Sequence, residues 1–174
     1  MGDRIEIVDP DPAWPDAYAA ERRRIEAALD GTKWLAIEHY GSTAVPGLPA
    51  KPIIDILMAV PSLDAAREAF PGRLAQLDYV FWSDNPKLDR LYFVKGMPPY
   101  GAKRTHHLHV CERPSAMWSQ LGFRDYLRDH PDEAARYALL KRELAARHAD
   151  DRDAYTDGKG DFIGAVMERI TGSR

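Results

Sequence analysis

A Gly-Ser-Thr turn followed by a lysine and an aspartate is the part of this sequence whose residue types most clearly predict chemistry. Gly41 lets the backbone approach a ligand closely, and the hydroxyl and N–H groups of Ser42 and Thr43 suit a phosphate. Lys51 supplies a positive charge, and Asp55 is a hard oxygen ligand of the kind that magnesium prefers. Together these residues predict part of a site for a nucleotide or other phosphorylated small molecule with a divalent metal.

Asp55 interrupts an apolar run, residues 52–60, that is typical of a central strand. Strand alternation places it on one face with Ile53 and Leu57, so we expect the carboxylate to be at least partly buried. A buried charge needs a partner or a metal. A salt bridge with Lys51 or an arginine is the structural alternative to a metal.

A second candidate is the run Arg-Thr-His-His-Leu-His-Val at residues 104–110. Alternation places His107 and His109 on one face, where two imidazoles can ligate a metal or contact a phosphate, and Arg104 adds a positive charge. The run also resembles the signature of the histidine-triad nucleotide hydrolases. Cys111 stands where their third histidine, the nucleophile, is expected, so this activity is only an alternative.

Other candidates carry less information. Ser42 lies near His39, but its surroundings lack the second glycine of a nucleophile elbow, which argues against a serine hydrolase. Arg90, Arg124 and Lys159 are dispersed, and such residues form surface ion pairs more often than ligand contacts.

Composition narrows the class of protein. The net charge is −3 and the pI is near 6.1, so no overall basic field suggests a nucleic-acid partner. The single cysteine excludes an internal disulfide and a Cys-rich zinc site. The amino end is too polar for a signal peptide, and no apolar run approaches the ~18 residues of a membrane span. We therefore expect a cytoplasmic protein with no membrane partner.

The elements that must position these residues follow from hydrophobic periodicity and from breakers. A mixed sheet followed by a helical C-terminal third predicts an α+β fold. Strands are expected at 4–8, 34–40, 52–60, 79–83, 90–95 and 104–111. Helices are expected at 14–29, at 63–77 with a break near Pro71-Gly72, at 118–128, from Pro131 onward, and at 152–170 with a weak point at Gly158 and Gly160.

Read end to end, the sequence resembles the GrpB family. The matching segments are Trp14-Pro15, residues 37–60, 104–110, 123–131, 137–145 and 154–163. This resemblance implies the nucleotidyltransferase-like fold, in which a mixed sheet is flanked by helices and a Gly-Ser turn holds a triphosphate. Related domains occur fused to bacterial dephospho-CoA kinases.

The sequence departs from that superfamily at the metal ligands. Active members carry two carboxylates two residues apart and a third on a neighbouring strand. These carboxylates bind paired magnesium ions, which stabilise the attacking and leaving oxygens. Here Ile53 and Leu57 flank Asp55, and His107 or His109 stands in the place of the third carboxylate. Imidazole suits manganese or zinc better than magnesium.

We therefore predict one domain over residues 1–174, with a sheet-containing core at 1–113 and a helical extension at 114–174. A divalent metal, Mg or Mn, would be ligated by Asp55 and His109, and His107 would complete the catalytic set. The expected substrate contacts are Gly41, Ser42, Thr43, Lys51, Arg104, Arg124 and Lys159. The reaction would be nucleotidyl or phosphoryl transfer to a small acceptor. The alternative is a non-catalytic ligand-binding or assembly domain.

Overall fold

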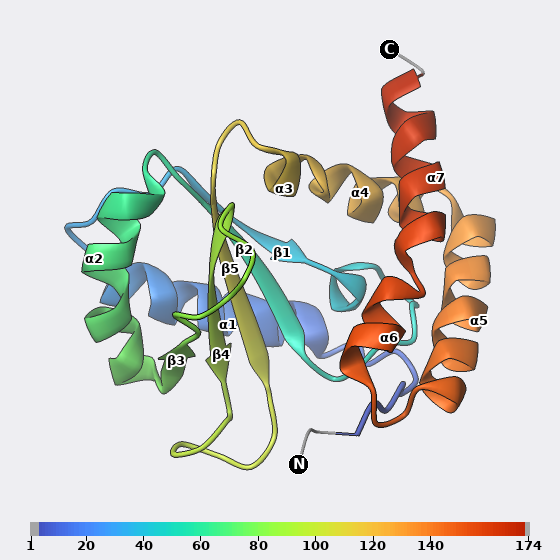
Figure 1. Cartoon of the computed structure of the whole chain (residues 1–174), viewed down its shortest axis with the longest axis horizontal. Helices are drawn as coiled ribbons and strands as arrows, with labels where there is room; N and C mark the ends of the chain where they lie inside the picture. The colour runs from blue at the N-terminus through green and yellow to red at the C-terminus, as the bar shows by residue number, and fades with distance from the viewer. Residues whose placement is uncertain (1–3, 173–174) are drawn as a thin grey trace.

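The computed structural model describes residues 4–172 and shows a five-stranded mixed sheet with helices on both faces (Figure 1). This confirms the predicted α+β class. The strands are β1 (Ala36–Tyr40), β2 (Ile54–Val60), β3 (Tyr79–Phe81), β4 (Arg90–Lys95) and β5 (His106–Glu112). The helices are α1 (Trp14–Ala28), α2 (Leu63–Leu74), α3 (Ala116–Ser119), α4 (Leu121–Asp129), α5 (Pro131–Arg147), α6 (Arg152–Asp157) and α7 (Gly160–Gly172), with 3₁₀ turns η1 (Ser42–Ala44) and η2 (Ala75–Leu77).

The strand order β1-β2-β5-β4-β3 places β2 and β5 in the middle of the sheet. These two strands are parallel, whereas the other neighbouring pairs are antiparallel. In this register Asp55 lies between Tyr40 of β1 and His107 of β5. His109, two residues further along β5, lies opposite Tyr92 of β4. The pairing of the strands therefore brings the carboxylate and the two histidines onto neighbouring positions.

The two faces of β2 and β5 have different partners, as the alternation predicts. Ile54, Ile56 and Met58 belong to the main core together with Leu108 and Val110 of β5. Helices α1 and α2 cover this face, and their buried side chains that contact it are Trp14, Ile25, Ala66, Phe70 and Leu74. In Figure 1 the sheet lies between α2 on the left and the C-terminal helices α5, α6 and α7 on the right. The face that carries Asp55 is turned toward these later elements.

Three of the expected elements differ from the structure. Residues 4–8 form no strand, because only Val8 pairs, in an isolated bridge with Ala50. Helix α2 continues through Pro71, because Phe70 and Leu74 on the same helix are buried in the core and this burial outweighs a proline cost of about 3 kcal/mol. The segment expected as one helix at 118–128 is divided into α3 and α4.

The predictions for the remaining helices hold. Helix α1 begins at Trp14, α5 begins at Pro131, and the glycine-rich point separates α6 from α7. Between residues 4 and 172 no helix is both long and apolar enough to cross a membrane. The division into a core at 1–113 and an extension at 114–174 stays a prediction, and its residues 1–3 and 173–174 lie outside the described chain.

The main core generates a first prediction. Phe93 of β4 is fully buried and stacks on Phe81 with ring centroids 4.8 Å apart. Phe93→Ala should lower the free energy of unfolding by about 3–5 kcal/mol, because it removes buried area and leaves a cavity. Urea unfolding measures this. Leu88→Ala is the control: Leu88 is 83% exposed, so its change should stay within about 0.5 kcal/mol. Equal effects for the two variants would contradict this view of the core.

Candidate functional site

A cleft of about 450 Å³ lies between the Asp55 face of the sheet and the C-terminal helices. Its lining comes from β1 and the following turn, from β2, β4 and β5, and from helices α3 to α7. Every residue singled out as a site candidate lines this cleft: Gly41, Ser42, Thr43, Lys51, Asp55, Arg104, His107, His109, Arg124 and Lys159. The structure thus brings them together, while their individual roles stay predictions.

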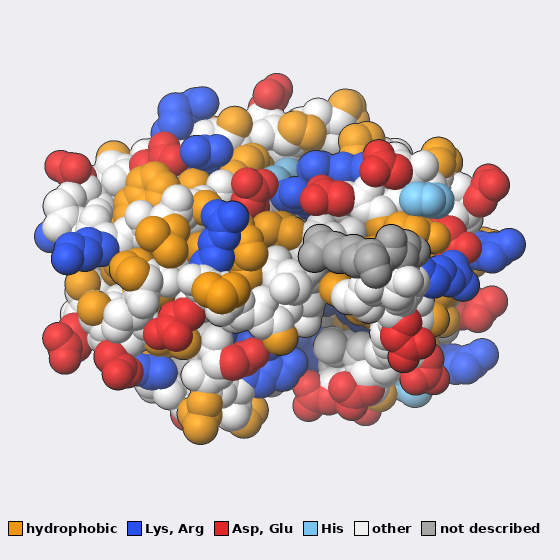
Figure 2. Space-filling model, turned by 90° about the horizontal axis from the view of Figure 1, so that it is seen from above, with side chains coloured by type: hydrophobic (Ala, Val, Ile, Leu, Met, Phe, Trp, Pro, Cys, Tyr) orange, Lys and Arg blue, Asp and Glu red, His pale blue; other side chains and the backbone are white. Residues whose placement is uncertain are grey.

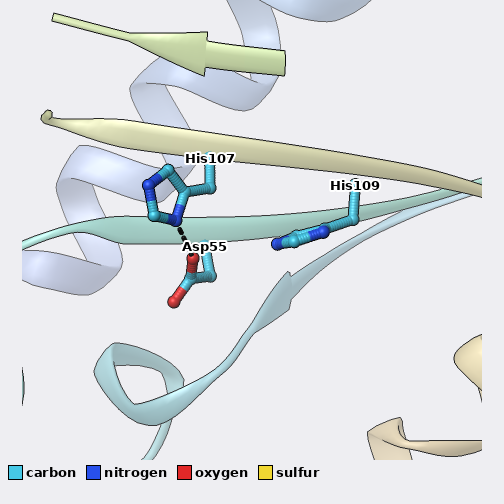
Figure 3. A group of neighbouring side chains, drawn as sticks. All are labelled: Asp55, His107 and His109. Atoms are coloured by element: carbon cyan, nitrogen blue, oxygen red, sulfur yellow. Dashed lines mark hydrogen bonds and ion pairs between the residues drawn. The ribbon is translucent and has the colours of Figure 1, made fainter. Parts of the chain in front are cut away.

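Asp55, His107 and His109 form the polar centre of the cleft (Figure 3). The Nδ1 atom of His107 lies 2.9 Å from the Oδ1 atom of Asp55, at hydrogen-bonding distance. His109 lies two residues after His107 on the same face of β5, and its ring extends toward this pair. One potential ligand atom from each of the three side chains lies within 4.8 Å of the other two. This spacing fits three ligands of one metal ion after small side-chain movements.

The protonation of this group favours metal ligation. Burial acts to raise the pKa of the Asp55 carboxyl, but the hydrogen bond from His107 and the nearby positive charges outweigh it and lower the pKa. Asp55 is therefore ionised near neutral pH. Burial lowers the pKa of His109 to about 3, so this imidazole is neutral and keeps a free lone pair. Two imidazole nitrogens and one carboxylate suit manganese or zinc better than magnesium.

Aromatic rings fix the orientation of His109. Tyr92 stacks on it with ring centroids 4.8 Å apart, and Tyr40 meets it edge-on at 6.0 Å. The Tyr40 hydroxyl in turn donates a 2.7 Å hydrogen bond to Oε1 of Gln120. The Nδ1 atom of His109 is buried with no hydrogen-bond partner among the described residues. The ring is therefore held by packing rather than by polar contacts.

Gly41 makes room for Asp55. It adopts φ = 73°, and a Cβ atom built on it would lie 2.6 Å from Oδ2 of Asp55. Both the backbone conformation and the missing side chain are needed at this position. The close approach predicted for a ligand is thus made in the structure by the carboxylate of the protein itself.

Two arginines of α4 hold the Gly-Ser-Thr turn. Arg124 donates to the His39 carbonyl at 2.8 Å and to Glu38 Oε2 at 2.9 Å. Arg128 donates from Nε and Nη2 to the Ala44 carbonyl at 3.0 and 2.7 Å. The carbonyls at both ends of the turn are therefore bound by α4. Arg124 lines the cleft, but three of its neighbours already accept its hydrogen bonds, the third being Asp125.

His39 fixes the turn from the opposite side. Its Nε2 atom lies 3.0 Å from Oγ1 of Thr43, and Tyr18 stacks on its ring at 4.6 Å. His39 therefore pairs with Thr43 and not with Ser42, which removes support from the serine-hydrolase reading. Cys111, at the position of the missing histidine-triad nucleophile, is fully buried beside Leu57.

The lining of the cleft is strongly cationic. Its acidic residues within the described chain are Asp55 and Asp153, whereas its basic side chains are Lys51, Lys87, Arg90, Arg104, Arg124, Lys141, Arg152 and Lys159. The chain as a whole carries a net charge of −3. On the face seen in Figure 2, side chains of both signs are interspersed. Positive charge is thus concentrated in the cleft, where an anionic ligand would be stabilised.

Sequence reasoning missed several lining residues, among them Lys141 and Arg152. Lys141 follows Tyr137 by four residues and precedes Leu144 by three, so it falls in the buried stripe of α5. A lysine in an apolar stripe is a signal that could have identified it. No comparable pattern distinguishes Arg152.

Comparison with known proteins agrees with this architecture. The family model described as GrpB protein matches residues 4–169. The chain belongs to the GrpB family. The resemblance inferred from the sequence is thereby confirmed. The crystal structure of the conserved protein GrpB from Enterococcus faecalis matches this chain with a TM-score of 0.82 and 32% sequence identity. The match covers 94% of this chain and 96% of that one.

GrpB relatives differ in length. A UPF0157 protein of Pseudomonas aeruginosa is 51% identical over 96% of this chain and 68% of its own length. The UPF0157 protein YqkA of Bacillus subtilis is 39% identical over 95% of this chain, and the match covers only 47% of the length of YqkA. A dephospho-CoA kinase of Mycolicibacterium paratuberculosis is 34% identical over 87% of this chain and 42% of its own length.

The contact between Gly41 and Asp55 yields a second prediction. Gly41→Ala should destabilise the fold by more than Gly47→Ala, which shares a positive φ of 74° but has no atom within 4 Å of its added Cβ. Both variants place an L side chain at positive φ, which costs about 1–3 kcal/mol of backbone strain. Urea unfolding gives the difference, which reports the clash with Asp55. In an Asp55→Ala background this excess should shrink, because the 2.6 Å contact to Oδ2 is gone. An unchanged excess would contradict the contact.

His39 yields a prediction on pH. Burial lowers its pKa from 6.5 to about 4, and the Arg128 and Arg124 charges act in the same direction. The unfolded chain therefore binds this proton more readily than the folded one. The contribution to stability is fully present above about pH 6.5 and is lost as the pH falls toward 4, by about 3 kcal/mol in all.

Chemical unfolding of His39→Gln across this range should show a flatter pH dependence than that of the unmodified chain. The same substitution at exposed His130 serves as the control. A pH profile of His39→Gln that parallels the unmodified chain would show that His39 is not the titrating group.

Proposed function

We propose that this GrpB-family chain binds a nucleotide or another phosphorylated small molecule in the cleft, together with a divalent metal. The observation that carries the proposal is the excess of lysine and arginine over carboxylates in the lining of the cleft, around Asp55 and two histidines. Transfer of a nucleotidyl or phosphoryl group to a small acceptor is the reaction that this arrangement suits best.

The metal would be held by Asp55, His107 and His109, which extends the predicted pair of Asp55 and His109 by one ligand. A metal bound to Nδ1 of His107 would replace the hydrogen bond to Asp55. When bound, it supplies positive charge that polarises phosphate oxygens. The neutral state of His109 suits ligation, and a pKa of about 3 makes this imidazole too weak a base to carry a proton at neutral pH.

The other residues of the cleft would bind and orient the phosphate. Ser42 and the N–H groups of η1 follow Gly41 at the mouth of the metal site, and Lys51 and Arg104 line the same cleft. Phosphoryl transfer depends mainly on positioning and charge neutralisation. The α4 arginines keep the turn rigid, which is the condition for such positioning.

The relatives support a phosphorylated ligand. One of them is named dephospho-CoA kinase, which describes a phosphoryl-transfer enzyme, and this chain matches 42% of its length. The remaining part of that protein has no counterpart in this chain, so its name bears only on the class of ligand.

A second candidate function is ligand binding without catalysis. The observation that favours it is the single carboxylate on β2, where Ile53 and Leu57 occupy the positions of a second metal-binding carboxylate. One three-ligand metal centre can orient a phosphorylated ligand without the paired ions of a standard nucleotidyltransferase.

Thermal unfolding with a panel of nucleoside triphosphates, with and without Mn²⁺, Zn²⁺ or Mg²⁺, tests the proposed function. A ligand at a hundred times its Kd should stabilise the chain by about 2.7 kcal/mol. Asp55→Asn should abolish the metal-dependent part, because the amide keeps the shape of the carboxylate and loses its charge. Asp30→Asn, at an exposed position outside the cleft, is the matched control.

An unchanged metal-dependent shift in Asp55→Asn would disprove the metal role. Phosphorus NMR of the same mixtures separates the two candidates. Release of pyrophosphate or phosphate with an added acceptor indicates transfer, whereas metal-dependent binding without turnover indicates a binding domain.

A further inference from the structure

Three lysines from separate parts of the chain gather around Tyr155 and Tyr137. Lys51 precedes β2, Lys141 lies on α5, and Lys159 lies between α6 and α7. The Nζ atoms of Lys51 and Lys159 lie 5.0 and 4.5 Å from the ring centroid of Tyr155, which is 1% exposed. All three lysines line the cleft. We call them the lysine cluster.

The lysine cluster forms no ion pair within the described chain, and the Asp55 carboxylate acts on Lys51 and Lys159 only from beyond ion-pair distance. Within residues 4–172, no ion pair joins any of these three lysines to a carboxylate. Lys141 is 2% exposed, lies 5.0 Å from the Tyr137 ring centroid, and donates to the Pro49 carbonyl. An ammonium group has three donors, so this contact leaves further capacity.

The cluster is electrostatically unfavourable without a ligand. Burial, together with the charges of Lys159 and Arg152, lowers the pKa of Lys51 to about 8 against the opposing charge of Asp55. Burial, Lys159 and Lys51 together lower the pKa of Lys141 to about 7. Burial is also the main cause of the lowered pKa of Lys159. An anion bound among these desolvated like charges would stabilise them.

We propose that Lys51, Lys141 and Lys159 form a subsite for a chain of two or three phosphate groups. This inference rests on the proposed function and narrows its ligand to a nucleoside diphosphate or triphosphate. Lysine binds phosphate as a point charge, as the lysine of phosphate-binding loops does. Three ammonium groups that line one cleft suit a ligand with several phosphates better than a monophosphate.

The subsite adjoins the metal site. Asp55 is the carboxylate whose charge acts on both Lys51 and Lys159. A phosphate chain on the lysine cluster would therefore reach toward Asp55 with one of its ends. Arg152, whose charge also lowers the pKa of Lys51 and of Lys159, lines the same cleft.

Calorimetric titration with inorganic triphosphate, pyrophosphate and orthophosphate, in EDTA, tests the subsite without any metal. Triphosphate should bind more tightly than orthophosphate. Lys159→Met and Lys51→Met should each weaken triphosphate binding by about tenfold or more, as expected for one lost charge-assisted hydrogen bond. Lys33→Met, at an exposed position outside the cleft, is the matched control and should change it by less than about twofold.

Proton uptake on binding is a measurement that a purely structural role of Lys141 would leave unchanged. At pH 8 the free chain holds Lys141 mostly neutral, and a bound polyanion raises its pKa, so binding should take up protons. Titrations in two buffers of different ionisation enthalpy measure this uptake, which Lys141→Met should reduce. Circular dichroism of each variant shows whether it has folded, and triphosphate affinity is compared only among folded variants.

The outcomes separate the subsite from the proposed function. Nucleotide binding that requires metal and Asp55 but is unchanged in all three lysine variants would overturn the subsite and leave the function standing. Triphosphate binding that depends on the lysines, with no metal-dependent nucleotide binding, would support the subsite and overturn the function. Equal affinity for citrate and triphosphate would overturn the assignment to phosphates.

Discussion

The placement of the Asp55 carboxylate is the constraint on which the rest of the site depends. It occupies the space beside Gly41 that any other residue would fill with a Cβ atom, and His107 binds its other oxygen. An ionised group in this position requires polar or cationic neighbours. The histidines, the Gly-Ser-Thr turn and the surrounding lysines and arginines meet that requirement. The other face of the same strand is hydrophobic and packs in the core against α1 and α2.

The site thus combines a rigid frame with an unbalanced charge. The frame consists of the central strands, the α4 arginines on the turn and the aromatic rings around His109. Because these contacts are made within the protein, the geometry of the centre does not depend on a ligand. The charge is not balanced in this way, since no ion pair within the described chain joins the lysine cluster to a carboxylate. Ligand binding would therefore change electrostatics more than shape.

Much of this arrangement could be predicted from the sequence, because it rests on local rules. Alternation along residues 52–60 and 104–110 predicts which face of its strand carries Asp55 and which carries the two histidines. The residue types of the Gly-Ser-Thr segment predict the turn. Register between strands is set by tertiary packing, so the pairing of Asp55 with His107 was not predictable. The same holds for Lys141, whose burial depends on α5 packing over the cleft, and for Pro71, which stays helical because its neighbours are buried.

The parallel pairing of β2 with β5 also bears on the order of folding. Asp55 and His107 are separated by 52 positions in the chain, and they meet only after the intervening α2, β3 and β4 have been accommodated. Closing so long a loop costs conformational entropy before any contact rewards it. A nascent chain that ends before β5 holds the turn and the carboxylate but lacks His107, His109 and the α4 arginines that bind the turn. The three-residue centre therefore forms only once β5 has paired with β2.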